Sequence, residues 1–63
     1  MIVQYKRSEL LKYDYEVFVN GKPTDYRIAK EDDWYYVYEN GHILDRFSYY
    51  RQAKEFIEKR LTK

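Results

Sequence analysis

Two Asn-Gly dipeptides, Asn20-Gly21 and Asn40-Gly41, constrain the fold of this 63-residue chain more than any other feature. Asn and Gly both tolerate the positive φ angles that a two-residue type I′ hairpin turn requires. Each dipeptide is flanked by alternating sequence rich in β-branched and aromatic residues, which is typical of half-buried strands. The sequence therefore predicts two antiparallel hairpins joined by a polar turn at 30–33, with strands over 13–19, 22–30, 34–39 and 42–47.

The first hairpin has a clear division between its two faces. If the register is continuous from the turn, Val19 lies opposite Lys22, and side chains alternate between the faces along each strand. The face predicted for the core collects Tyr13, Tyr15, Val17, Val19, Tyr26 and Ile28. The other face collects Asp14, Glu16, Phe18, Asp25 and Arg27. This register also pairs Glu16 with Asp25, and like charges directly opposite each other are unfavourable.

The second hairpin is apolar on both faces. A continuous register places one set of side chains together: Trp34, Tyr36, Tyr38, Ile43 and Phe47. The opposite set is Tyr35, Val37, Leu44 and Arg46. A single helix covers only one face of a sheet. We expect the set that contains Phe47 to meet it, and the reverse facing is the alternative.

The C-terminal segment has the pattern of an amphipathic helix. Ser48 is a favourable N-cap residue, and the apolar positions that follow recur at helical spacing over about 49–61. The stripe consists of Tyr49, Ala53, Phe56, Ile57 and Leu61. Residues 2–6 alternate weakly and could add an edge strand. The predicted fold class is α+β: one domain, a small antiparallel meander of two hairpins, possibly with an extra N-terminal strand, packed against one C-terminal helix.

Composition limits how this chain can be stabilised and where we expect it to reside. A chain of this length buries only about 60% of its unfolded surface, and without cysteine it has neither disulfides nor a Cys-based zinc site. No apolar run reaches the 18 or so residues of a membrane span, and the N-terminus lacks a signal-peptide pattern. The sequence therefore predicts a cytoplasmic domain with no membrane partner.

Residues that could carry chemistry are few, and each has a simpler structural explanation. His42 is the only histidine and follows a turn, so it lacks an orienting partner for acid–base catalysis. The run Glu31-Asp32-Asp33 lacks the spacing of a calcium loop, and Ser48 is better placed as a cap than as a nucleophile. Both glycines belong to hairpin turns, which leaves no phosphate-binding glycine loop. The sequence therefore predicts no catalytic residues, metal, cofactor or small-molecule substrate.

The aromatic content exceeds what a core of this size can hide. The chain holds nine Tyr, three Phe and one Trp, and each such side chain can bury roughly 150–250 Å². Contiguous exposed apolar surface usually marks an interface, and Tyr and Arg are common binding hot spots. The predicted partner-binding surface is Phe18, Tyr35, Val37 and Leu44, flanked by Arg27 and Arg46. Its expected occupant is another protein or a second copy of this chain.

One stretch resembles a known family. Residues 34–38, followed by Gly41, Leu44, Phe47, Ala53, Phe56 and Ile57, are similar to the three-stranded-sheet-plus-helix domain at the N-terminus of phage and transposon integrases. Small free-standing phage proteins share that pattern, and the resemblance covers about residues 13–61. It implies binding of double-stranded DNA by the sheet face, here through Arg27, Arg46 and Lys22.

Charge decides the order in which we rank the functions. The net charge is only +1, and the acidic residues of the first hairpin's second face would repel phosphate. The leading prediction is therefore a non-enzymatic protein-binding module. The resemblance and the small size imply a phage or mobile-element accessory or inhibitor protein that docks on a larger protein. Binding of double-stranded DNA and a structural homodimer are the alternatives.

Overall fold

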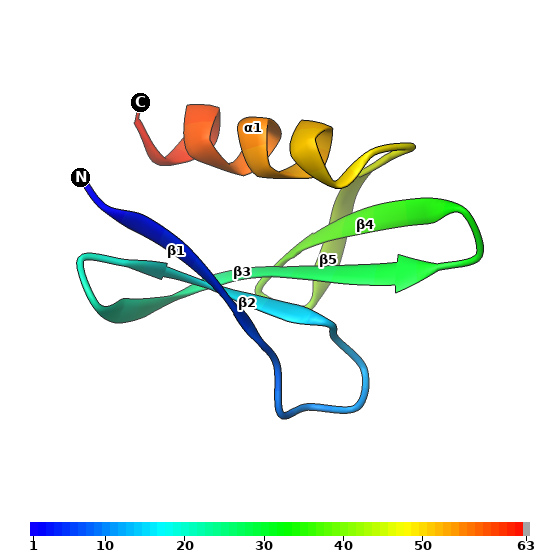
Figure 1. Cartoon of the computed structure of the whole chain (residues 1–63), viewed down its shortest axis with the longest axis horizontal. Coiled ribbons are helices and arrows are strands. Elements are labelled where there is room, and N and C mark those ends of the chain that lie inside the picture. The colour runs from blue at the N-terminus through cyan, green and yellow to red at the C-terminus, as the bar shows by residue number, and fades with distance from the viewer. Residues whose placement is uncertain (63) are drawn as a thin grey trace.

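A computed structural model describes residues 1–62 as one sheet with one helix packed on it. The elements are β1 (Val3–Arg7), β2 (Tyr15–Val19), β3 (Lys22–Glu31), β4 (Trp34–Glu39), β5 (His42–Phe47) and α1 (Tyr50–Leu61). The strands lie in the order β1-β2-β3-β4-β5, and each pairs antiparallel with the next. The helix lies across one face of this meander (Figure 1). The predicted α+β class is confirmed, and β1 is the extra N-terminal strand.

Tight turns dictate the meander. Asn20 and Gly21 have φ angles of 52° and 82°, and Asn40 and Gly41 have 52° and 84°, so both dipeptides have the positive φ values of type I′ turns. Between them, Glu31 pairs with Trp34 and leaves Asp32-Asp33 as a third two-residue turn. A two-residue connection forces each strand to pair with its sequence neighbour.

The first hairpin contains a bulge that corrects the predicted register. Phe18 pairs with Pro23 as the turn requires, but Glu16 pairs with Arg27, so β3 contains two extra residues opposite Val17. The Thr24 hydroxyl donates to the Val17 carbonyl oxygen at 2.8 Å within this bulge. An even insertion leaves the faces unchanged, and it replaces the predicted Glu16–Asp25 repulsion with an attractive pair.

The second hairpin contains a one-residue bulge, and here the predicted faces are wrong. Tyr38 pairs with Ile43, whereas Val37 pairs with Asp45, so Leu44 is the extra residue. A one-residue shift moves all subsequent side chains to the other face. Phe47 therefore lies opposite Tyr35, on the same face as the helix.

The core forms where α1 crosses the centre of the sheet. The buried cluster is Val17, Tyr26, Ile28, Val37, Ala53 and Ile57, and Phe56 and Leu61 pack partly buried against it. No helix in residues 1–62 has the length and apolar character needed to cross a membrane.

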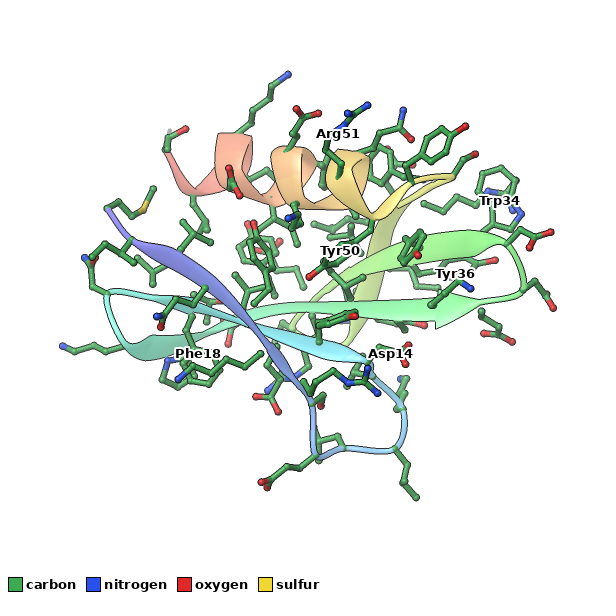
Figure 2. All side chains as sticks on the ribbon, in the orientation of Figure 1. Asp14, Phe18, Trp34, Tyr36, Tyr50 and Arg51 are labelled. Carbon is green, nitrogen blue, oxygen red and sulfur yellow. The ribbon has the colours of Figure 1, made fainter. Side chains whose placement is uncertain are left out.

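The helix begins one residue later than the sequence predicts. Tyr49, not Ser48, is the N-cap residue, and the Gln52 side chain accepts a hydrogen bond from the Tyr49 N–H at 3.3 Å. Tyr49 is 65% exposed, and Tyr50 projects between helix and sheet in its place (Figure 2). The predicted position of Tyr49 on the buried stripe is therefore wrong.

Removing side-chain volume beneath the helix should destabilise the whole domain. Ile57 is fully buried, so we expect Ile57→Ala to lower the free energy of unfolding by about 2–5 kcal/mol and Ile57→Val by about 0.5–1.5 kcal/mol. Denaturant titrations followed by circular dichroism measure both, with Tyr49→Ala as the exposed control. An unchanged midpoint for Ile57→Ala would show that the helix contributes nothing to the core.

The turn at Gly41 should be sensitive to backbone strain alone. A Cβ atom added at Gly41 meets nothing within 4 Å, but the φ angle of 84° is unfavourable for alanine. We expect Gly41→Ala to reduce stability by about 1–2 kcal/mol, and Gly41→Asn to reduce it less, because Asn tolerates this conformation. Equal thermal stability of Gly41→Ala and the wild type would contradict the turn assignment.

Candidate functional site

The single helix leaves the face of the sheet turned away from it uncovered, and we call this the open face (Figure 1). Its cross-strand rows contain Lys6, Glu16, Phe18, Arg27, Ala29, Trp34, Tyr36, Tyr38, Ile43 and Arg46. Figure 2 shows Phe18 projecting from the side of the sheet opposite the helix. Ala29 is only 6% exposed although α1 does not cover it, so the larger side chains around it form a continuous layer.

Basic side chains lie over the aromatic rings of the open face. The Arg46 guanidinium carbon is 4.3 Å from the Trp34 ring, and the Lys6 ammonium is 4.7 Å from the Phe18 ring. At these distances a cation is attracted to the negative face of an aromatic ring. The surface therefore alternates flat rings with positive charge.

The loop between β1 and β2 extends the open face. Tyr13 precedes β2 and meets Tyr38 edge-on, with ring centroids 5.0 Å apart, so its predicted place in the core is wrong. Lys12 and Arg27 both lie within about 5.5 Å of the Tyr13 ring. The loop also leaves Leu11 fully exposed.

Arg27 anchors the centre of the open face. Its guanidinium is 3.9 Å from the Glu16 carboxylate, and the two side chains are about one quarter exposed. The Ser8 hydroxyl also donates to Glu16 at 3.2 Å. Within residues 1–62, the buried Arg27 Nε has no hydrogen-bond partner. Glu16 is therefore paired with Arg27, and the Arg27 Nε keeps unused donor capacity.

The predicted binding residues divide between the two faces. Phe18, Arg27 and Arg46 lie on the open face, as expected. Val37 is fully buried under α1, and Tyr35 packs against Tyr50 of the helix, so neither belongs to an exposed patch. Leu44 lies at the bulge of an edge strand and is 37% exposed.

The residues that the sequence analysis missed on this surface are Tyr13, Trp34, Tyr36, Tyr38 and Ile43. One signal could have found three of them. Trp34, Tyr36 and Tyr38 point to one face of β4, and Tyr35 and Val37 point to the other. Only the face with Tyr35 contains an aliphatic side chain, Val37. Aliphatic side chains suit a fully covered core better than Tyr or Trp, whose polar ends need partners or water.

The covered face holds a second group of aromatic side chains, Tyr5, Tyr15, Tyr35 and Tyr50, which we call the tyrosine cluster. The Tyr50 ring centroid lies 4.8 Å from that of Tyr15, 5.7 Å from that of Tyr35 and 6.3 Å from that of Tyr5. The Tyr5 hydroxyl donates to Glu58 at 2.7 Å. Burial, followed by the hydrogen bond and the charge of Glu58, raises the pKa of Tyr5 far above its usual value.

Possible metal ligands do not cluster in the described part of the chain. Residues 1–62 contain no group of three or more His, Asp or Glu side chains that could hold a metal ion. His42 is exposed at the start of β5. Two surface hollows lie along α1, lined mainly by Phe47, Phe56 and the charged residues Glu55, Glu58 and Lys59. Neither hollow includes residues of the open face.

Comparison with protein-family models, with curated proteins and with solved structures finds no match to this chain. The resemblance to the integrase DNA-binding domain therefore stays a prediction. Its residues lie on β4, β5 and α1 and, for Gly41, in the turn between the two strands, within a sheet of five strands rather than three.

The raised pKa of Tyr5 predicts alkaline destabilisation. The folded-state pKa of Tyr5 lies above the unfolded value of about 10. The stabilisation that comes from protonated Tyr5 is therefore complete below pH 10 and is lost as the pH rises above it. We expect Tyr5→Phe to make the loss of stability above pH 10 shallower, because the titrating group is removed. Denaturation midpoints of wild type, Tyr5→Phe and the exposed control Tyr49→Phe, measured from about pH 8 to about pH 11.5 and so on both sides of the usual Tyr pKa of about 10, test this. Parallel curves for wild type and Tyr5→Phe would exclude this linkage.

Proposed function

We propose that this domain is a non-enzymatic module that binds a protein through the open face. The observation that carries the proposal is that one helix covers one face of the sheet, while the other face presents Trp34, Tyr36 and Tyr38 between Arg27 and Arg46. Trp, Tyr and Arg are the residue types that most often dominate binding energy at protein interfaces. An accessory or inhibitory role on a larger protein fits such a surface.

The mixed charge of the open face favours a protein over a nucleic acid. Lys6 and Arg27 each lie opposite Glu16 in neighbouring strands, so the central row alternates in sign. An alternating row complements a protein surface of opposite pattern, whereas a nucleic acid offers only negative charge.

Rigidity supports the same role. All five strands are joined by backbone pairing, so the aromatic side chains stand on a fixed scaffold rather than on a mobile loop. Binding through a preformed surface avoids much of the entropy of ordering interface side chains. A second copy of the chain could occupy the same surface, and the homodimer alternative is decided by mass measurement in solution.

Double-stranded DNA is the second candidate, and one observation favours it. Four basic side chains, Lys6, Lys12, Arg27 and Arg46, lie over rings of the open face. If all of them met phosphates, the slope of log K against log salt would be about −3 to −4. Binding that is submicromolar at physiological salt and depends on sequence would rank this function first.

The proposal predicts that Tyr38 is a binding residue and Tyr49 is not. Photo-crosslinkers at positions 36 and 49 would first identify partners in extract, and only position 36 should yield one. With that partner purified, or with self-association as the reaction, Tyr38→Ala should weaken binding by more than about 1 kcal/mol, roughly fivefold. Tyr49→Ala is the matched control, because Tyr49 is an exposed tyrosine away from the open face. Unchanged affinity for both Tyr38→Ala and Phe18→Ala would contradict the proposal.

A further inference from the structure

Basic side chains from three different elements surround the tyrosine cluster on the covered face. They are Arg7 of β1, Lys30 of β3 and Lys54 of α1. The distances from charged group to ring centroid are 5.6 Å for Arg7 on Tyr15, 5.9 Å for Lys30 on Tyr35 and 4.9 Å for Lys54 on Tyr50. Because the rings of Tyr15 and Tyr35 both pack against Tyr50, the three cations share one corner of the molecule.

The positive charge at this corner is only partly neutralised. Within residues 1–62, the ion pairs are Arg27–Glu16 and Arg60–Glu39, and neither involves this group. Two carboxylates reach this group: Glu58 accepts a hydrogen bond from the Tyr5 hydroxyl at 2.7 Å, and Asp14 accepts one from the backbone N–H of Lys30. Three cations against two carboxylates leave a net positive charge. The corner also lies at the start of α1, whose first turn contains no acidic residue.

The hydroxyl groups of the cluster add neutral donors. Those of Tyr15, Tyr35 and Tyr50 make no hydrogen bond to any residue in 1–62, and they are not among the buried unpaired atoms, so they reach solvent. Burial raises the pKa of Tyr50, which keeps its hydroxyl protonated. Arg7 and Lys30 are themselves exposed, so a ligand has access to them.

We propose that Arg7, Lys30, Lys54 and the hydroxyls of Tyr15, Tyr35 and Tyr50 form a binding site for a phosphate dianion, free or as a monoester. Phosphate oxygens accept hydrogen bonds from Arg, Lys and Tyr side chains, and hydrogen bonds to an ionised oxygen are about twice as strong as neutral ones. The net positive charge of the corner attracts the dianion. The site uses no residue of the open face and does not rest on the proposed protein-binding role.

Nuclear magnetic resonance titration with sodium phosphate tests the site directly. At about pH 8, where phosphate is largely the dianion, we expect saturable shifts at the backbone amides of Arg7, Lys30 and Tyr50, with Kd on the order of 1 mM. Sodium chloride at matched ionic strength is the reference. A parallel titration with phosphoserine distinguishes a phosphate monoester from the free ion. The form that binds more tightly is assigned as the ligand of the site.

Charge-neutral variants separate a site from general salt effects. The double variant Arg7→Gln/Lys30→Gln should weaken phosphate binding at least about tenfold, whereas Lys22→Gln/Lys59→Gln, which removes the same charge elsewhere, should leave it unchanged. Tyr50→Phe keeps the ring but removes one donor, and should weaken binding less. Dispersed amide spectra confirm folding of each variant. Equal shifts in both double variants, or shifts that grow linearly and match those in chloride, would overturn the proposal.

Discussion

The packing of one helix on the centre of a five-stranded sheet is the constraint on which the rest of this structure depends. Ala53 and Ile57, four residues apart on α1, meet the aliphatic side chains of the three central strands and are fully buried. A single helix has one such stripe, so it can close only one face. The other face must remain stable in water, and its chemistry follows from that requirement.

On both faces of the sheet, partly exposed aromatic rings are accommodated in the same way. Tyrosine keeps its hydroxyl in water while its ring packs, and Lys or Arg lies across the exposed part of the ring. On the open face this is seen at Arg46 over Trp34, and at the helix edge at Lys54 over Tyr50. A small domain can therefore carry many aromatic side chains without a core large enough to bury them. The same arrangement concentrates Tyr, Trp and Arg where partners can reach them.

Local rules predicted the parts of the fold that depend on local chemistry. The Asn-Gly turns, the apolar positions of the helix from Ala53 onward and the weak alternation of β1 are properties of neighbouring residues, and the structure has them. The start of the helix was predicted less well, because Tyr49 is the exposed N-cap residue rather than part of the buried stripe. The faces of β4 were wrong because they depend on one residue, Leu44, whose bulge has no local signature. Whether Phe47 reaches the helix depends on its packing against Phe56, with ring centroids 5.3 Å apart, which is a tertiary contact. Consequently Phe18, Arg27 and Arg46 were placed correctly, and Tyr35 and Val37 were not.

The bulge in β5 also connects the fold to the way in which this domain can associate. In a continuous strand Ile43 and Phe47, four residues apart, would share a face. The extra residue separates them, so that Phe47 packs under α1 and Ile43 lies beside Tyr38 on the open face. Bulges also twist an edge strand away from further pairing. In addition, the Asp45 carboxylate accepts a hydrogen bond from the backbone N–H of Arg46 at 2.7 Å. Pairing of another chain along this edge is thereby opposed, which is consistent with the proposed use of the side chains of the open face, rather than the backbone of β5, for binding a partner.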